Sequence, residues 1–209
     1  MILFIMEYLA LVPFLLLTTF IPLPTAKTVW NPIFVAFSGN NRSVYDAWRD
    51  QSDSNPIPTD LAGASRERHL RSPLIDSWSN NKIKKVKIEL YNEDCMLVWL
   101  IFDGSDTHWL DWFRKDKLLS SSFDGVKENK EFEFFSMVEM ENAAFVIQRV
   151  YHDCLNDFGW FIVLDSGVSC EWTEREIFPL IKYTTNGTPR NWNNDAQKAD
   201  RMVVYVLTS

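Results

Sequence analysis

The sequence has few of the residues from which metal and catalytic sites are usually built. Among 209 residues there are three cysteines and three histidines, and no two cysteines have the close spacing, with a histidine partner, of a zinc site. The Gly-x-Ser-x-Gly pattern of a hydrolase nucleophile is absent, although His69, His108 and His152 stand among many serines and aspartates. Cys95 has no adjacent basic residue that would activate its thiol as a nucleophile. The sequence therefore argues against these kinds of catalytic centre.

Long apolar runs are also scarce, and the one that is present lies at the start of the chain. Residues 1–26 carry a single charge, at Glu7, and polar sequence follows from Lys27. This pattern predicts a secretory signal peptide cleaved near Ala26, with a signal anchor as the alternative because no Lys or Arg precedes the apolar core. No later stretch is long enough to cross a bilayer, so we expect a secreted, extracellular protein with no stable membrane span after cleavage.

The charge is negative overall and unevenly distributed. A formal net charge of −7 gives no long-range attraction to nucleic acid, so a nucleic-acid partner is not expected. Residues 89–176 contain nineteen acidic and seven basic side chains. Such a patch is usually a solvated face, and the alternative is a surface that meets Ca²⁺, mineral or a cationic partner.

Two features fit an oxidising compartment. Cys154 and Cys170 are 16 positions apart and flank an apolar run that begins at Gly159, so we predict a disulfide between them, which leaves Cys95 buried, exposed or paired with another chain. Asn41 and Asn186 each begin an Asn-x-Ser/Thr pattern in turn-rich sequence, which predicts N-glycosylation in an exported chain.

Hydrophobic patterning predicts a mainly β protein. Residues 86–91 alternate apolar and polar side chains, residues 96–102 form a nearly continuous apolar run, and the turn residues at 92–94 between them indicate a hairpin. One helix is predicted over 109–119, where Trp109, Trp112, Phe113 and Leu119 share a face. Further strands are predicted over 132–138, 144–151, 160–165, 178–185 and 202–207.

The expected organisation is a signal peptide over 1–26, a loop-rich segment over 27–66 and one β domain over 67–209. The segment 27–66 is rich in Pro, Gly, Ser and Asn and has at most a short strand at 33–37. Short strands with few helices favour an antiparallel β-sandwich or a jelly-roll-like domain with few short helices.

Two sequence patterns suggest binding sites, although each also has a simpler structural explanation. Oxygen donors gather at tight turns around Asp103 and Asp106, and again around Asp153 and Asp157, which is where Ca²⁺ would bind if it binds at all; turn chemistry alone explains both groups as well. The second signal is an aromatic ring flanked by amide and carboxylate groups, which predicts a glycan-binding site, although most Trp residues of a sandwich belong to its core. This group comprises Trp192, Asn193 and Asp195.

Several short blocks in fixed order resemble a group of secreted proteins of corals, anemones and other marine invertebrates, some of them found in coral skeletal organic matrix. The resemblance spans most of residues 68–183, includes both Cys154 and Cys170, and supplies no activity for named residues. It implies a secreted protein of an extracellular or mineralising matrix. The blocks that carry it are Arg71-Ser72-Pro73-Leu74-Ile75-Asp76-Ser77-Trp78, Val86-Lys87-Ile88-Glu89-Leu90-Tyr91, Trp112-Phe113, Leu118-Leu119-Ser120-Ser121-Ser122, Phe134-Phe135-Ser136, Cys154-Leu155-Asn156-Asp157-Phe158-Gly159-Trp160 and Cys170-Glu171-Trp172.

These observations give two expectations for function. The first is a secreted binding or structural protein of an extracellular matrix, with matrix components, glycans or Ca²⁺ as partners and no organic cofactor. The alternative is a carbohydrate-active enzyme, or a lectin-like glycan binder, on a β-sandwich scaffold. An enzyme of this kind needs two carboxyl groups that face each other across a cleft, about 5 to 10 Å apart.

Overall fold

The computed structural model describes residues 29–58, 60–61, 63–137, 142–150, 154–185 and 187–209. The predicted signal peptide over 1–26, the glycosylation candidate Asn186 and the metal candidate Asp153 lie outside the described residues. Among the described residues no helix is both long and apolar enough to span a membrane.

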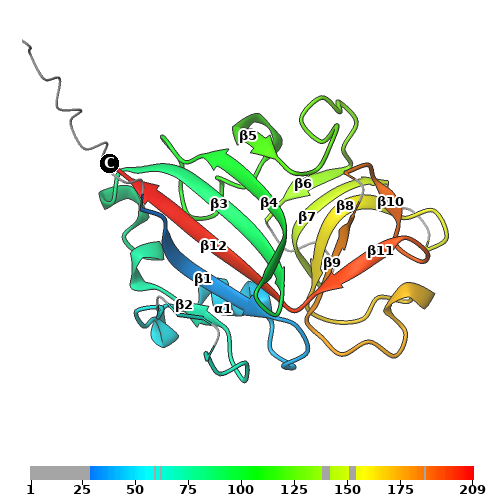
Figure 1. Cartoon of the computed structure of the whole chain (residues 1–209), viewed down its shortest axis with the longest axis horizontal. Coiled ribbons are helices and arrows are strands. Elements are labelled where there is room, and N and C mark those ends of the chain that lie inside the picture. Colours follow the sequence, from blue (N-terminus) through cyan, green and yellow to red (C-terminus); the bar gives the residue numbers. More distant parts are fainter. Residues whose placement is uncertain (1–28, 59, 62, 138–141, 151–153, 186) are drawn as a thin grey trace, which may run out of the picture.

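The protein is mainly β, as the sequence predicts, and its strands pair antiparallel in two sheets (Figure 1). Neighbouring strands of the first sheet are β2 (Leu70–Arg71), β1 (Asn31–Phe37), β12 (Arg201–Thr208), β3 (Ile83–Asn92), β4 (Cys95–Asp103) and β5 (Leu118–Ser121), in that order. The second sheet has the order β11 (Ala196–Ala199), β9 (Leu180–Thr184), β8 (Phe158–Leu164), β7 (Ala143–Val150) and β6 (Phe134–Ser136), and β10 (Arg190–Asn191) pairs with β8.

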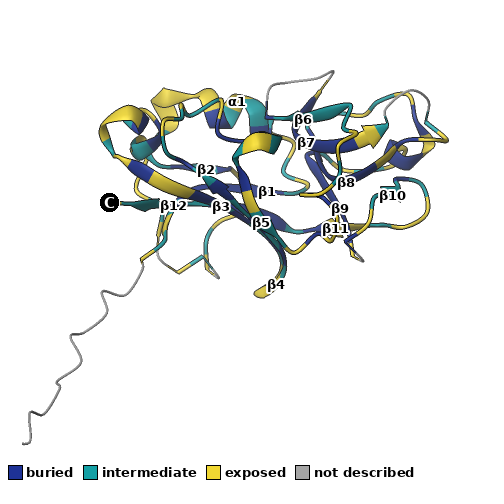
Figure 2. Cartoon of the chain, turned by 90° about the horizontal axis from the view of Figure 1, so that it is seen from above, coloured by how far each residue is buried: buried dark blue, intermediate teal, exposed yellow. Residues whose placement is uncertain are grey.

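Helical structure in the described residues is short. One α-helix, α1 (Val44–Arg49), lies on the same side of the molecule as β6 and β7 when the chain is seen from above (Figure 2). The remaining helical segments are single 3₁₀ turns at Gln51–Asp53, Pro73–Ile75, Trp78–Asn80, Lys115–Lys117 and Glu171–Thr173.

The two sheets and α1 share one hydrophobic core. Inward side chains of β1, β3, β4 and β12 pack in the same cluster as those of β7, β8 and β9. Aromatic rings fill its centre, and burying such large apolar side chains is the main driving force of folding. The fully buried rings that contact one another there are those of Phe34, Trp48, Phe102, Trp112, Phe113, Phe145 and Phe161.

The predicted hairpin is confirmed as β3 and β4. Alternate residues of β3, namely Val86, Ile88 and Leu90, are fully buried, while the residues between them are partly exposed. Glu93 takes a left-handed backbone conformation, φ 51°, in the tight turn that joins the strands. The alternation therefore separates an inner face, which joins the core, from an outer face that reaches solvent.

The predicted helix over 109–119 is wrong. This stretch consists of turns, the 3₁₀ turn at Lys115–Lys117 and the first residues of β5. The adjacent rings of Trp112 and Phe113 are both buried and contact each other, with centroids 5.7 Å apart. A helix directs consecutive side chains about 100° apart, so it does not bring two neighbouring rings together in this way.

The segment 27–66 supplies part of the first sheet. Strand β1 lies between β12 and β2 and is buried along most of its length. The loop that follows α1 folds back over the outer face of β1, where its side chains pack against Val35, Phe37 and Val203. The loop residues in this small cluster are Ile57, Leu61 and Ala64.

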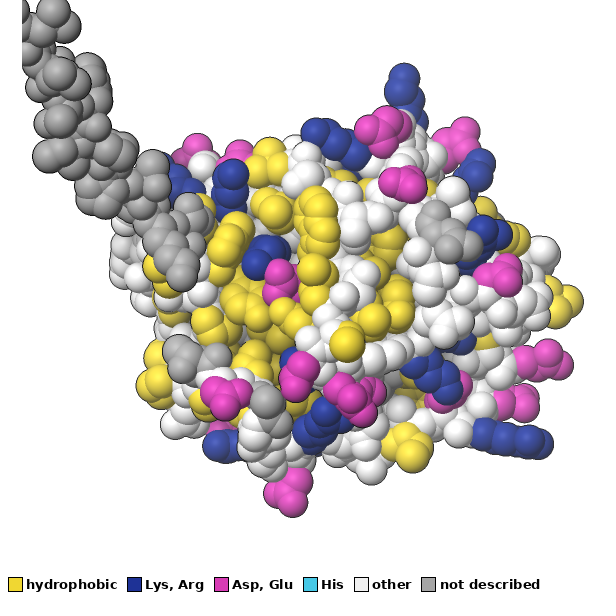
Figure 3. All heavy atoms as spheres, in the orientation of Figure 1, with side chains coloured by type: hydrophobic (Ala, Val, Ile, Leu, Met, Phe, Trp, Pro, Cys, Tyr) yellow, Lys and Arg dark blue, Asp and Glu magenta, His cyan; other side chains and the backbone are white. Residues whose placement is uncertain are grey.

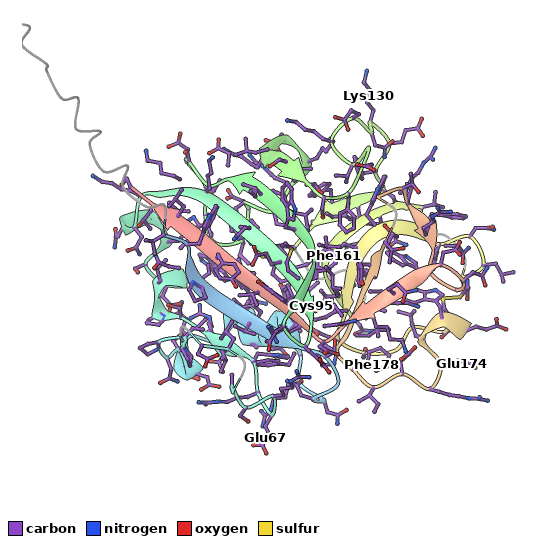
Figure 4. The ribbon with its side chains drawn as sticks, viewed as in Figure 1. Glu67, Cys95, Lys130, Phe161, Glu174 and Phe178 are labelled. Carbon is purple, nitrogen blue, oxygen red and sulfur yellow. A yellow bond between two sulfur atoms is a disulfide. The ribbon has the colours of Figure 1, made fainter. Side chains whose placement is uncertain are left out.

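The predicted disulfide between Cys154 and Cys170 is present, and Cys95 is free and exposed. The bridge joins the loop before β8 to the loop after it. Side-chain amides hold the same region, because Asn193 Nδ2 donates to the carbonyl of Cys154 at 2.7 Å. Cys95 lies at the end of the β3–β4 hairpin (Figure 4).

Candidate functional site

The indole predicted to bind glycans is buried. Trp192 has no exposed surface, and its ring packs against that of Trp172 at a centroid distance of 6.2 Å. A sugar ring therefore has no access to it, and Trp192 belongs to the packing of the second sheet. Its two predicted companions have other positions: Asn193 holds the backbone of Cys154, and Asp195 is an exposed turn residue whose N–H donates to the carbonyl of Asn191.

The three described aspartates proposed for Ca²⁺ have different surroundings. Asp103 accepts from the backbone N–H of Ser105 at 2.9 Å, which lowers the pKa of its carboxyl group, and it lies 3.8 Å from Lys117 Nζ. Asp106 is an exposed turn residue, whereas Asp157 is buried and accepts from Trp172 Nε1 at 3.3 Å. In the described part of the chain, no group of three or more His, Cys, Asp or Glu side chains has the geometry of a metal site.

Asn41 is exposed in the turn between β1 and α1, with a left-handed φ of 59°. His69 is buried: its Nδ1 accepts from the backbone N–H of Phe37 at 3.1 Å and its Nε2 lies 2.9 Å from the carbonyl of Arg42. Burial lowers the pKa of His69. This histidine therefore serves the backbone around β1.

A hollow of about 350 Å³ lies beside α1 and contains carboxylates and arginines. Asp53 pairs with Arg68 at 2.9 Å, and Asp50 accepts from both the N–H and the hydroxyl of Ser52. The two hydrogen bonds from Ser52 lower the pKa of Asp50. The general acid of a glycosidase needs a raised pKa so that it stays protonated. The lowered pKa of Asp50 is the opposite of this requirement, so Asp50 is unsuited to be the proton donor of a carbohydrate-active enzyme.

The most distinctive surface is the outer face of the first sheet, where four aromatic side chains surround an ion pair. We call this surface the aromatic face, and Figure 3 shows hydrophobic side chains over β12, β3 and β4 with basic and acidic side chains among them. Its residues are Trp30, Lys87, Glu89, Tyr91, Trp99, Ile101 and Tyr205, all of them partly exposed.

Strand register builds the aromatic face. Lys87 of β3 lies between Tyr205 of β12 and Ile101 of β4, and Glu89 is directly opposite Trp99. Directly opposed residues on neighbouring antiparallel strands project to the same side, with Cβ atoms about 5 Å apart. Because the intervening residues point into the core, the sheet presents these side chains together on its outer side.

The ion pair of the aromatic face is shielded by rings. Lys87 Nζ lies 2.7 Å from Glu89 Oε1, and the two side chains are 16% and 13% exposed. The ammonium of Lys87 also lies 4.8 Å from the ring centre of Trp30 and 4.7 Å from that of Tyr205. Cations at this distance from a ring are held by its quadrupole, so Lys87 is fixed from three sides.

The hydroxyl groups of Tyr91 and Tyr205 lie beside the ion pair of the aromatic face. Tyr91 donates its hydroxyl hydrogen bond to Glu89 Oε2 at 2.5 Å, and the Tyr205 hydroxyl lies 3.4 Å from that of Tyr91. Burial, followed by the bond to Glu89, raises the pKa of Tyr91, and burial raises the pKa of Tyr205. Both hydroxyls therefore remain protonated and able to donate at neutral pH.

Sequence reasoning missed the aromatic face, although the two strands carry its signal. Residues 86–91 alternate cleanly, whereas residues 96–102 are apolar at nearly every position, including Trp99 and Ile101. When such strands pair in one hairpin, one of them places apolar side chains on the solvent side. That contrast is the sequence sign of an exposed apolar patch, and such patches mark interaction sites.

A scan against models of protein families, a search of curated proteins and a search of solved structures each find no match to this chain.

Proposed function

We propose that this protein is an extracellular binding protein that holds a carbohydrate on its aromatic face. The observation that carries the proposal is the Lys87–Glu89 pair, 2.7 Å apart and largely desolvated in the midst of four aromatic side chains. A desolvated ion pair adds little to stability and can often be replaced by apolar residues without loss. Its presence at the centre of an apolar surface is better explained by a ligand that needs both kinds of contact.

Carbohydrates make both apolar contacts and polar hydrogen bonds with the proteins that bind them. One side of a pyranose ring carries axial C–H groups that pack on an aromatic ring, while its rim carries hydroxyls that donate and accept hydrogen bonds. Trp99 supplies an indole on the outer face next to Glu89, and the carboxylate and ammonium supply charge-assisted hydrogen bonds, which are stronger than neutral ones.

The extracellular part of the proposal is supported by the chain itself. The disulfide between Cys154 and Cys170 is typical of oxidising compartments, and residues 1–26 read as a secretory signal. A glycan-binding protein outside the cell is suited to an organic matrix. Expression in animal cells tests this part: the expected product is a chain in the medium that begins near Lys27, and retention of the chain inside the cell contradicts it.

Binding is tested by depletion of the purified, folded protein by insoluble polysaccharides, namely cellulose, chitin, xylan and agarose. We expect at least one of them to deplete the wild-type protein at physiological salt, and Trp99→Ala to weaken that binding by about tenfold or more. Phe158→Ala is the matched control, because Phe158 is a partly exposed aromatic residue of the second sheet. Equal binding by wild type and Trp99→Ala, or no depletion by any polymer, overturns the proposal.

A further inference from the structure

Two ion pairs lie on the aromatic face and at its edge. Lys87 is paired with Glu89 on the face itself. Arg201, the first residue of β12, lies 3.2 Å from Asp94, and its guanidinium lies 4.6 Å from the ring centre of Tyr91. In each of these two pairs the cation therefore already has an anionic partner. The net charge of −7 adds a repulsive field for polyanions at long range.

The hydrogen-bonding capacity that remains is mixed. Each oxygen of Glu89 already accepts one bond, from Lys87 or from Tyr91, and a carboxylate has about four acceptor sites in all. The ammonium of Lys87 has three N–H donors, one of which points to Glu89. The Tyr91 hydroxyl already donates to Glu89, so the Tyr205 hydroxyl, 3.4 Å away, is the donor in the contact between the two tyrosines. Acceptors and donors thus stand side by side at one place.

A hydroxyl group fits this arrangement, because it donates to Glu89 and accepts from Lys87. A carboxylate or sulfate group does not fit, because it accepts only. It would also place a negative charge beside the carboxylate of Glu89 and compete with it for Lys87, which would leave a largely desolvated carboxylate without its counter-ion.

We infer that the ligand of the aromatic face is a neutral, hydroxyl-rich glycan without carboxylate or sulfate groups, and that Glu89 is the residue that rejects charged glycans. This inference rests on the proposed function and narrows it. Trp99 gives affinity through stacking, whereas Glu89 gives selectivity by hydrogen bonding to hydroxyls and repelling anions.

The test uses matched polymers that differ in charge: hydroxyethylcellulose and carboxymethylcellulose, dextran and dextran sulfate, and agarose and sulfated carrageenan. Retardation of the folded protein in gels that contain each polymer gives the affinities. We expect retention by at least one neutral polymer, about tenfold weaker retention by its charged counterpart, and little change between about 50 and 500 mM salt. A neutral polymer carries no charge, so its attraction to the protein contains no ionic part for salt to screen.

Variants separate selectivity from affinity. Glu89→Gln is nearly isosteric, removes the negative charge and should reduce the preference for the neutral polymer by at least about fivefold. Trp99→Ala should weaken binding to both members of a pair and leave their ratio unchanged. Glu131→Gln is the control, since Glu131 is an exposed carboxylate of the loop before β6. Thermal unfolding confirms that each variant is folded.

The possible results separate the inference of a neutral glycan from the proposal that the aromatic face binds carbohydrate. Stronger binding to the charged members, with loss in Trp99→Ala, overturns the inference and leaves carbohydrate binding on the aromatic face in place. An unchanged preference in Glu89→Gln also overturns the inference. Absence of binding to every polymer overturns both, and so does self-association of the protein through this face, which sedimentation of wild type and Trp99→Ala would reveal.

Discussion

The carboxylate of Asp165 accepts a hydrogen bond from the hydroxyl of Ser43 at 2.7 Å, although the two residues are 122 positions apart. The same carboxylate accepts from the backbone N–H groups of Val44 at 2.6 Å and Tyr45 at 2.9 Å. Helices leave their first N–H groups without intrahelical partners, and an acceptor at that position stabilises them. A residue that directly follows β8 thus fixes the start of α1.

Removal of this carboxylate should destabilise the protein measurably. Asp165→Ala leaves two backbone donors and a hydroxyl without their acceptor, so we expect the free energy of unfolding to fall by about 2 kcal/mol in urea titrations. Asp165→Asn keeps one acceptor oxygen and should lose less. Asp195→Ala, at an exposed turn, is the control. A loss for Asp165→Ala of less than about 0.5 kcal/mol contradicts the assigned role.

The disulfide gives a second prediction. Replacement of both Cys154 and Cys170 by Ser should lower the free energy of unfolding by about 3 kcal/mol, because the unfolded chain regains the entropy that the bridge removes from a loop of this size. Cys95→Ser should leave stability unchanged, since that thiol is free and exposed. Equal stability of the double variant and the wild type, measured under non-reducing conditions, would show that the bridge does not constrain the unfolded state.

Sequence patterns were sufficient to predict those parts of the fold that depend on residues close together in the chain. The hairpin of β3 and β4 follows from period-2 alternation and turn chemistry between residues 92 and 94, and the disulfide from the spacing of Cys154 and Cys170. The helix predicted over 109–119 fails because the packing of Trp112 and Phe113 on distant strands outweighs local propensity.

The candidate site was not predicted because it depends on strand pairing across the sequence. Trp30 directly precedes β1, whereas Glu89 belongs to β3 and Tyr205 to β12, and sequence spacing does not show that these strands are neighbours in one sheet. Burial of Trp192 is equally non-local, because the absence of a side chain at Gly159 makes room for the indole. Polar neighbours in sequence therefore mislead about which tryptophan reaches solvent.

That close approach yields a third prediction. A Cβ atom added at Gly159 would lie 2.9 Å from the carbonyl oxygen of Ile147 and would overlap the indole of Trp192. Gly159→Ala should therefore destabilise the protein by about 1 to 3 kcal/mol through overpacking. Gly63→Ala is a matched control, because nothing lies within 4 Å of its Cβ position. Equal melting temperatures for the two variants would contradict this account of how Trp192 is accommodated.

Lys182 gives the last prediction, which concerns pH. Its side chain is buried on β9, where Nζ donates to the carbonyl of Trp192 at 2.8 Å and lies 5.3 Å from the ring centre of Trp172. Burial lowers the pKa of this amine from 10.5 to about 8. Between these two values the unfolded chain holds a proton that the folded protein has released, so this group makes folding more favourable as the pH rises through that window.

The measurement compares wild type with Lys182→Met in urea titrations at several pH values from about 7 to 10.5. The free energy of unfolding of the wild type should increase relative to that of the variant, with a slope of at most about 1.4 kcal/mol per pH unit. Ionisation of tyrosines affects both proteins and cancels in the difference. Lys130→Met, at an exposed position that points away from the fold (Figure 4), should show no such trend. A difference that is flat or that falls with pH would mean that Lys182 is not held in an apolar environment, and that the contact between β9 and the Trp172 loop is open to water.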